Sequence, residues 1–197
     1  MFITLEGGEG AGKSTQARRI AAHFSARGRP VFLTREPGGT AGSEAIRGLL
    51  LSRGWEGGTE MLLHFAARRE HVARAIRPAL AAGAVVVCDR FADSSLAYQV
   101  AGQGGTRSMW QGLVDLTLGG VWPELTFLLD LPPEAGLARA AARGETNRYE
   151  TLGLDFHTRI REAFLRQAAA EPGRFRVIDA TQKLDTVTEA ILAGLPV

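Results

Sequence analysis

The stretch Gly7-Gly8-Glu9-Gly10-Ala11-Gly12-Lys13-Ser14 fits the phosphate-loop pattern G-x-x-x-x-G-K-[ST] at every fixed position. It follows an apolar run at residues 2–5 and precedes a segment of helical period at residues 14–26, the context that this pattern requires. Glycines allow consecutive backbone N–H groups to turn inward around an anion, and the following helix adds the positive end of its dipole. In this pattern Lys13 reaches the β- and γ-phosphates, and the Ser14 hydroxyl holds Mg²⁺. The stretch therefore predicts a site for a nucleoside triphosphate and its magnesium ion.

The predicted triphosphate site includes the whole loop and the residue after it. Its members are Gly7, Gly8, Glu9, Gly10, Ala11, Gly12, Lys13, Ser14 and Thr15, the last of which offers a second hydroxyl to the phosphates. A dinucleotide fingerprint would need a third glycine where Lys13 stands. The guanine motif Asn-Lys-x-Asp is absent, because Gly12 precedes Lys13 and Gln182 precedes Lys183, the other lysine. We therefore expect the nucleotide to be ATP.

Apolar, β-branched runs alternate with longer segments of helical period along the whole chain. The predicted strands cover residues 2–5, 30–34, 84–88, 125–131 and 175–178. The predicted helices cover residues 14–26, 42–52, 59–82, 94–103, 108–118, 133–143, 154–170 and 184–192, with a kink or break expected at Pro78. This alternation predicts an α/β fold, a five-stranded parallel sheet with helices on both faces, made by a single domain over residues 1–197.

Composition excludes several classes of protein. The 197 residues include one cysteine, Cys88, which rules out an internal disulfide framework and suits a reducing cytoplasm. The longest small-apolar stretch, residues 79–88, is about half of the twenty or so residues that a membrane span needs. A strand-like run follows Met1 directly, so we expect no secretory signal. The arginines are scattered and the net charge is only +2, so we expect no nucleic-acid partner and no membrane association.

A kinase also needs a pocket for the molecule that accepts the phosphoryl group, which we call the acceptor side. Candidate residues for it follow the other predicted strands, because parallel sheets bind ligands beyond the carboxyl ends of their strands. Arg35 follows the second strand, and Arg47 lies in the next helix. Asp89 ends the third strand at a Walker-B-like position, where a carboxylate holds Mg²⁺ directly or through water, and Arg90 beside it can grip a phosphate. The remaining candidates are aromatic or polar and come from two helices: His64, Phe65, Arg68, Ser95, Tyr98 and Gln99.

Seven stretches, in order along the chain, resemble the thymidylate kinases, the dTMP kinases among the P-loop nucleoside monophosphate kinases. They are the phosphate loop, Arg35-Glu36-Pro37-Gly38-Gly39-Thr40, Phe65-Ala66-Ala67-Arg68, Asp89-Arg90 with Ser94-Ser95 and Tyr98-Gln99, Leu128-Leu129-Asp130, Arg143-Gly144-Glu145 and Asp179-Ala180-Thr181. The resemblance implies transfer of the γ-phosphoryl group of ATP to dTMP, with Mg²⁺, by a homodimer that contributes to dTTP synthesis.

The resemblance also implies roles for the acceptor-side residues. Arg68 corresponds to the family's donor to thymine O4, while Ser95 and Gln99 fall where the family reads the base edge. Tyr98 falls where the family crowds the sugar 2′ position. Glu9 corresponds to the family's loop acid, which faces the acceptor 3′-hydroxyl or the waters of the metal. The residues on the acceptor-phosphate side are Arg35, Arg47 and Arg90.

The sequence does not decide which of two adjacent residues, His64 or Phe65, stacks on the thymine base. The family's stacking phenylalanine aligns with His64, and Phe65 comes one place later. Either the imidazole stacks on the base or the helix is rotated slightly.

A short lid carries the arginines that are expected to neutralise charge during transfer. Family members place this arginine either in the phosphate loop or in the lid, and residues 8–11 include no arginine. We therefore predict a lid at about residues 143–151, with Arg143 and Arg148 as catalytic residues beside Lys13, Arg90 and Glu9. Arg139, further back on the helix, is predicted to bind ATP.

Two other functions fit the phosphate loop. Another nucleoside monophosphate kinase, for uridylate, cytidylate or adenylate, would differ only around Arg68, Ser95, Tyr98 and Gln99. A non-catalytic nucleotide-binding module would bind ATP without turnover, although the intact Lys13, Ser14, Asp89 and Arg90 speak against it.

Overall fold

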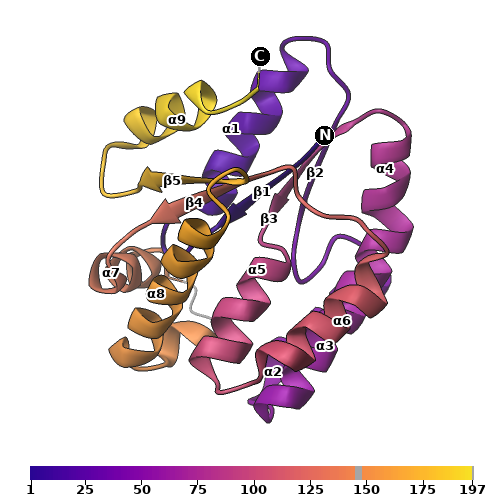
Figure 1. The fold of residues 1–197 in the computed structure, drawn as a ribbon. Helices are drawn as coiled ribbons and strands as arrows, with labels where there is room; N and C mark the ends of the chain where they lie inside the picture. The colour runs from indigo at the N-terminus through magenta and orange to yellow at the C-terminus, as the bar shows by residue number, and fades with distance from the viewer. Residues whose placement is uncertain (145–147, 197) are drawn as a thin grey trace.

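The five predicted strands form one parallel sheet in the computed structural model, which describes residues 1–144 and 148–196 (Figure 1). The strands are β1 (Phe2–Glu6), β2 (Val31–Arg35), β3 (Val85–Asp89), β4 (Leu125–Asp130) and β5 (Phe175–Asp179). Their order across the sheet is β2-β3-β1-β4-β5, and every neighbouring pair is parallel. The α/β prediction is confirmed.

Four strands extend one residue beyond the predicted apolar run, to Glu6, Arg35, Asp89 and Asp179. Backbone pairing continues to these polar residues; for example, Leu5 pairs with Asp89 and Asp130 pairs with Asp179. The sheet therefore carries charged side chains along the edge where its strands end, which is the edge at which parallel sheets bind ligands.

The described residues contain a helix in every segment where helical period predicts one. They are α1 (Lys13–Ser25), α2 (Ala41–Ser52), α3 (Gly57–His71), α4 (Arg77–Ala81), α5 (Ala92–Ser95), α6 (Arg107–Leu118), α7 (Pro133–Ala142), α8 (Leu154–Ala170) and α9 (Leu184–Ala193). Side chains cap several N-termini: Thr40 accepts a hydrogen bond from Ser43 N, and Thr106 accepts one from Met109 N. No helix in the described ranges is long and apolar enough to cross a bilayer.

The helix containing Pro78 does not break at the proline. A wide, π-helical turn, Val72–Ile76, joins α3 to α4, so the departure from α-helical geometry lies in the turn before Pro78. A second π-helical turn, Leu96–Gly102, extends α5 and carries Tyr98 and Gln99. Such turns are frequent at functional sites, because they rotate the side chains that follow relative to a regular helix.

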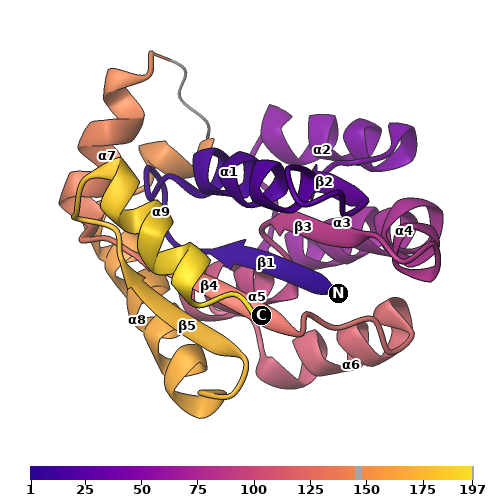
Figure 2. The same cartoon turned by 90° about the horizontal axis from the view of Figure 1, so that it is seen from above.

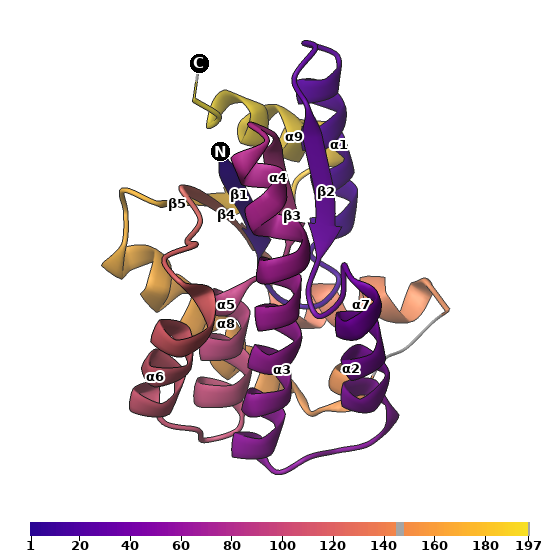
Figure 3. The same cartoon turned by 90° about the vertical axis from the view of Figure 1, so that its right-hand side faces the viewer.

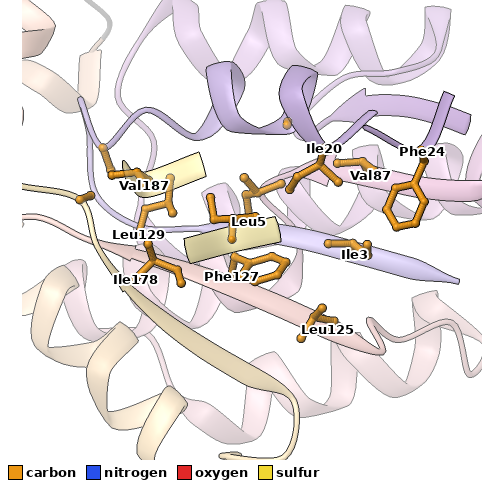
Figure 4. Close-up of a cluster of buried hydrophobic side chains, with 14 of the residues drawn as sticks. Ile3, Leu5, Ile20, Phe24, Val87, Leu125, Phe127, Leu129, Ile178 and Val187 are labelled. Atoms are coloured by element: carbon orange, nitrogen blue, oxygen red, sulfur yellow. The ribbon is translucent and has the colours of Figure 1, made fainter. Parts of the chain in front are cut away.

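One face of the sheet is covered by α1 and α9, which lie above the strands in Figure 1. Alternate strand residues point to this face: Ile3 and Leu5 from β1 pack with Ile20 of α1 and Val187 of α9 (Figure 4). Burial of each large apolar side chain contributes roughly 1.5–3 kcal/mol, so this layer fixes β1, and with it the phosphate loop, against α1.

The other face packs against α3, α5, α6 and α8. Phe2, Val86 and Cys88 contact the side chains of α3 and α6, while Leu128 contacts those of α8. In Figure 2 the arrowhead of β1 points toward α7, at the edge where the strands end. The two apolar layers cover the faces of the sheet but not this edge. The charged residues at the strand ends therefore make this edge suitable for a polar site.

Candidate active site

A cleft of about 710 Å³ lies along the carboxyl ends of the strands. Most of the predicted site residues line it: Glu9, Gly10, Gly12, Lys13, Ser14, Thr15, Arg35, Arg47, His64, Arg68, Asp89, Arg90, Ser95, Tyr98, Gln99, Arg139 and Arg143. Gly7, Gly8 and Ala11 belong to the loop but do not line the cleft, and neither do Phe65 and Arg148. The structure therefore brings the phosphate loop and the predicted acceptor side together in one space.

The phosphate loop is held against the start of α7. Gly10 has a φ of +69°, and a Cβ at this position would lie 2.0 Å from the carbonyl oxygen of Gly136. No side chain fits there, which explains the glycine. Inside the loop, Lys13 Nζ donates to Gly8 O at 2.6 Å. Burial, with Arg90 nearby, lowers the pKa of Lys13 to about 8, so an anion beside the ammonium would stabilise its charged form.

A hydroxyl and a carboxylate meet at the mouth of the loop. Ser14 Oγ donates a hydrogen bond to Asp89 Oδ2, from the start of α1 to the end of β3. Both are hard oxygen donors, the type that Mg²⁺ takes together with phosphate oxygens and water. The described residues contain no cluster of three or more His, Cys, Asp or Glu side chains that could hold a metal without such help. The donor set therefore fits a magnesium ion that arrives with a nucleotide.

Arg90 links the loop to the acceptor side. Its backbone has a φ of +71°, and its guanidinium donates to Gly7 O at 3.0 Å, Glu9 Oε1 at 2.8 Å and the Tyr98 hydroxyl at 3.0 Å. Burial alone would raise the pKa of Glu9, but Arg90 and Lys13 bring it down to about 2. Glu9 is therefore ionised at neutral pH, and it also accepts a hydrogen bond from Tyr98 at 2.9 Å.

Arg68 is fixed in a buried position on the opposite wall. Its Nε donates to Glu36 Oε2 at 2.6 Å, and its terminal nitrogens donate to Ser95 Oγ at 3.1 and 3.2 Å. Glu36 in turn contacts His71 Nδ1 at 3.0 Å. Because Glu36 and Ser95 hold both ends of the guanidinium, Arg68 presents a rigid donor to the cleft.

His64 lines the cleft, whereas Phe65 is buried in the apolar layer beneath α3. The prediction that Phe65 contacts the substrate therefore disagrees with its placement, because its ring packs against core residues and lies 4.6 Å under the Arg68 guanidinium. Burial and the nearby Arg68 lower the pKa of His64 to about 3. The imidazole is therefore neutral at pH 7, a state suited to stacking on an uncharged base.

The predicted acceptor-phosphate residues on the β2 side each have a protein partner. Arg35 donates to Glu44 at 2.9 Å, and Arg47 donates to Pro37 O at 2.9 Å. Burial and the charge of Arg35 lower the pKa of Arg47. Both arginines line the cleft, and an anion bound there would relieve the repulsion between their charges.

The predicted lid is described except for Glu145, Thr146 and Asn147, which lie outside the described residues. Arg139 donates to Ala180 O at 2.9 Å, and Arg143 pairs with Glu150 at 2.7 Å. Arg148 does not reach the cleft: its guanidinium forms an ion pair with Glu60, a buried residue of α3. Tyr149, next to it, does line the cleft.

Sequence reasoning missed several residues that build the site. They include Glu6, Leu50, Leu51, Glu60, Phe91 and Tyr149. Leu50 and Leu51 supply an apolar wall, and Glu36, quoted only as part of a motif, orients Arg68. Charged residues at the ends of apolar runs were a usable signal for Glu6. Nothing in the sequence indicated that Glu60 and Tyr149, 89 residues apart, form a hydrogen bond.

Replacing Glu6 with glutamine is expected to change how stability depends on pH. Glu6 is fully buried and accepts hydrogen bonds from Phe91 N at 2.6 Å and Ser94 Oγ at 2.5 Å. Burial, together with the charge of Asp93, raises the pKa of Glu6. The folded state therefore binds this proton more tightly than the unfolded state, and stability falls as pH rises through the raised pKa.

Chemical denaturation at a series of pH values between about 5 and 9 measures this effect. Over that range, the free energy of unfolding of the wild type should fall by at least about 1.4 kcal/mol more than that of Glu6→Gln. This difference is the equivalent of one pKa unit. Lys13, with its lowered pKa, works in the opposite direction in both proteins, so the difference between the two curves isolates Glu6. Parallel curves would contradict the assignment.

The chain matches the protein-family model described as thymidylate kinase over residues 5–191. It is 55% identical over 193 residues to a thymidylate kinase of Caulobacter vibrioides, covering 96% of this chain and 93% of that protein. It is 51% identical over 199 residues to a thymidylate kinase of Pseudomonas putida, covering 100% and 96%. Among solved structures, the thymidylate kinase from Ehrlichia chaffeensis superposes with a TM-score of 0.81 at 35% identity, covering 100% of this chain and 98% of that one.

Proposed function

The chain belongs to the thymidylate kinase family, the transferases that phosphorylate dTMP with ATP, and from this premise we propose how its residues divide the work. Residues 1–197 act as a single kinase domain, with the phosphate loop at 7–14 and the lid at about 143–151. The observation that carries the proposal is that Lys13 of the loop and Arg68 of the opposite wall line one cleft. One wall suits a triphosphate and the other an uncharged base.

The donor triphosphate occupies the loop, with Lys13 and the backbone N–H groups around its β- and γ-phosphates. A second hollow of about 400 Å³ continues from Gly12 to the segment after β5. Arg139, Ala180 and Gln182 line it, and this hollow is the place for the adenine and ribose. Arg139 lines both the cleft and this hollow, so it would contact ATP near the junction of the ribose and the α-phosphate.

The acceptor dTMP occupies the other side of the cleft. Arg90 binds its phosphate, together with Arg35 and Arg47. Arg68, held by Glu36, donates to thymine O4, and the neutral His64 stacks on the ring. The groups that read the base edge are Ser95 and Gln99. Tyr98 and Glu9, which are hydrogen-bonded to each other, face the sugar.

Transfer needs little covalent chemistry from the protein. A phosphate oxygen of dTMP attacks the γ-phosphorus, a new P–O bond forms, and the bond to the β–γ bridging oxygen breaks, giving ADP and dTDP. The second pKa of a phosphate monoester is near 6, so the attacking oxygen is largely deprotonated at pH 7 and no general base is required. Lys13, Arg90 and Arg143 align the two phosphates and neutralise charge on the transferring group. Mg²⁺, held by Ser14 and Asp89, would neutralise the β- and γ-phosphates of bound ATP.

A coupled ADP-release assay with dTMP, dUMP, UMP, CMP and AMP tests the proposed function. We expect kcat/KM for dTMP to exceed that for UMP, CMP and AMP, because Arg68 and Gln99 match the thymine edge and Tyr98 restricts the 2′ position. Comparison with dUMP, which has the same base edge and no 2′-hydroxyl, measures the effect of the 5-methyl group alone. A higher value for another monophosphate would identify the chain as a kinase for that nucleotide. ATP binding without turnover on any of them would identify a non-catalytic module.

We also propose that the protein is a homodimer, located in the cytoplasm, where Cys88 stays reduced. Figure 3 shows α3 between α2 and α6, and these three helices present Leu49, Leu62 and Leu116 to solvent, exposed by 51%, 51% and 77%. Large apolar side chains gathered on adjacent helices favour burial against a second copy.

Leu116→Arg is expected to shift the protein toward monomer, because a charge on this face would be desolvated by a second copy. Sedimentation velocity on the wild type and the variant measures the shift. Leu154→Arg, on α8, is the matched control at another exposed leucine (42% exposed) and should leave the sedimentation coefficient unchanged. A monomeric wild type would contradict the homodimer, and an unchanged Leu116→Arg would contradict this interface.

A further inference from the structure

We propose that Glu60, a carboxylate outside the cleft, fixes the orientation of the Gln99 side-chain amide and thereby makes the site select a base with a hydrogen on N3. The inference rests on the proposed function, which places Gln99 at the base edge. Glu60 lies on α3 and Gln99 in the π-helical turn after α5, and both side chains are buried. Glu60 would act through Gln99, as a positioning residue for substrate choice.

Glu60 is surrounded by donors. Its side chain is 0% exposed, and Oε1 accepts hydrogen bonds from Gln99 Nε2 at 3.0 Å, Gln103 Nε2 at 2.7 Å and the Tyr149 hydroxyl at 2.9 Å. Oε2 pairs with the guanidinium of Arg148. Every one of these contacts brings a donor to the carboxylate, so Glu60 acts here as a hydrogen-bond acceptor.

An ionised carboxylate can only accept hydrogen bonds. An amide side chain has nearly the same shape in its two flipped orientations, so its surroundings decide which end points where. Against Glu60, the Gln99 amide must present its NH₂ group, because a carbonyl oxygen there would face another acceptor. Glu60 thus determines the orientation of Gln99 whether or not a ligand is bound.

The other end of the same amide is then left for the ligand. Gln99 Oε1 is buried and has no hydrogen-bond partner within the described ranges, and Gln99 lines the cleft. Leaving a buried acceptor unpaired costs free energy, so a ligand that donates to it is favoured. Thymine carries a hydrogen on N3 and therefore donates at this position, whereas cytosine presents a lone pair on N3. Gln99 oriented by Glu60 would therefore accept thymine and reject cytosine.

Glu60→Gln tests the inference, because an amide at position 60 can accept or donate and so lets Gln99 flip. We measure kcat/KM for dTMP and for dCMP and compare their ratio with that of the wild type. The ratio of kcat/KM for dTMP to that for dCMP should fall by about tenfold or more, because Gln99 no longer distinguishes thymine from cytosine by a buried hydrogen bond. Glu60→Asp keeps an acceptor-only group and should retain the ratio, even if both activities decline.

Two further variants separate orientation from stability. Gln103→Leu removes another donor to Glu60 Oε1, from a side chain that does not line the cleft, and should leave the ratio unchanged. In a Gln99→Leu background, Glu60→Gln should cause no further change in the ratio, because Glu60 acts through Gln99. Equal losses on dTMP and dCMP in Glu60→Gln would show a structural role only and overturn the inference.

The same data distinguish failure of the inference from failure of the proposed function. A wild type that does not prefer dTMP overturns the proposed function. A wild type that prefers dTMP, with a reduced ratio in Gln99→Leu but not in Glu60→Gln, overturns the inference alone. If Glu60→Gln does not fold, NMR of the wild type with ¹⁵N3-labelled dTMP decides: a coupling across the hydrogen bond to the Gln99 side-chain carbonyl is expected, and its absence overturns the inference.

Discussion

Replacing Arg143 with alanine is expected to slow phosphoryl transfer in a single turnover by about 10³-fold, the lower end of the range for a catalytic arginine. Arg143 follows directly after α7, the helix that packs on the phosphate loop through Gly136. Gly136, Arg139 and Arg143 stand at positions i, i+3 and i+7, so they share one face of this helix. That face carries both arginines to the cleft, and Arg143 is the lid residue that we propose neutralises charge on the transferring group.

Quenched-flow measurement with enzyme in excess over ATP reports this step without interference from product release. Arg166→Ala is the matched control, since Arg166 is an exposed arginine of α8 that pairs with Glu162 at 3.4 Å; its rate should equal that of the wild type. Arg148→Ala should mainly weaken dTMP binding, because Arg148 pairs with Glu60. An unchanged rate in Arg143→Ala with a large loss in Arg148→Ala would transfer the catalytic role to Arg148, and unchanged rates in both would remove it from the lid.

The phosphate loop and the sheet could be predicted because both depend on local pattern. All strands of a parallel sheet end at the same edge, so the residues that follow the apolar runs, Asp89 and Arg90 among them, are predicted to lie at the edge that carries Lys13. The loop has a sequence pattern whose glycines answer a backbone requirement, as the approach of Gly10 to Gly136 shows.

The orientation of side chains within helices could not be predicted in the same way. Helical period places His64 and Phe65 about 100° apart, but the sequence does not show which of them turns toward the cleft. The answer depends on how α3 packs on the sheet, where Phe65 fills the apolar layer. Similarly, Arg148 is a lid arginine by position, and only the fold reveals the buried Glu60 that pairs with it.

Replacing Arg90 with methionine is expected to reduce kcat/KM for dTMP by about 10²–10³-fold and to destabilise the fold by roughly 3 kcal/mol. The catalytic loss follows from removing the guanidinium that we propose binds the acceptor phosphate. The loss of stability has a separate cause: Glu9 would keep its burial but lose the strongest charge that stabilises its anion. Arg90 and Glu9 are only 16% and 13% exposed, so water replaces little of that interaction.

Dependence on pH separates these two effects. In the wild type the pKa of Glu9 is lowered to about 2, so its ion pair contributes stability at neutral pH that is lost as pH falls from about 4.5 toward 2. The difference in stability between wild type and Arg90→Met should therefore be largest near pH 7 and smaller near pH 3.

The double variant Glu9→Gln/Arg90→Met provides the control, because it removes the unpaired carboxylate. It should recover most of the stability at neutral pH and none of the activity toward dTMP. If the double variant were as unstable as Arg90→Met, the loss of stability would come from the missing guanidinium contacts to Gly7 and Ser94, and Glu9 would not be the reason. Full activity in Arg90→Met would contradict the assignment of the acceptor phosphate to this arginine.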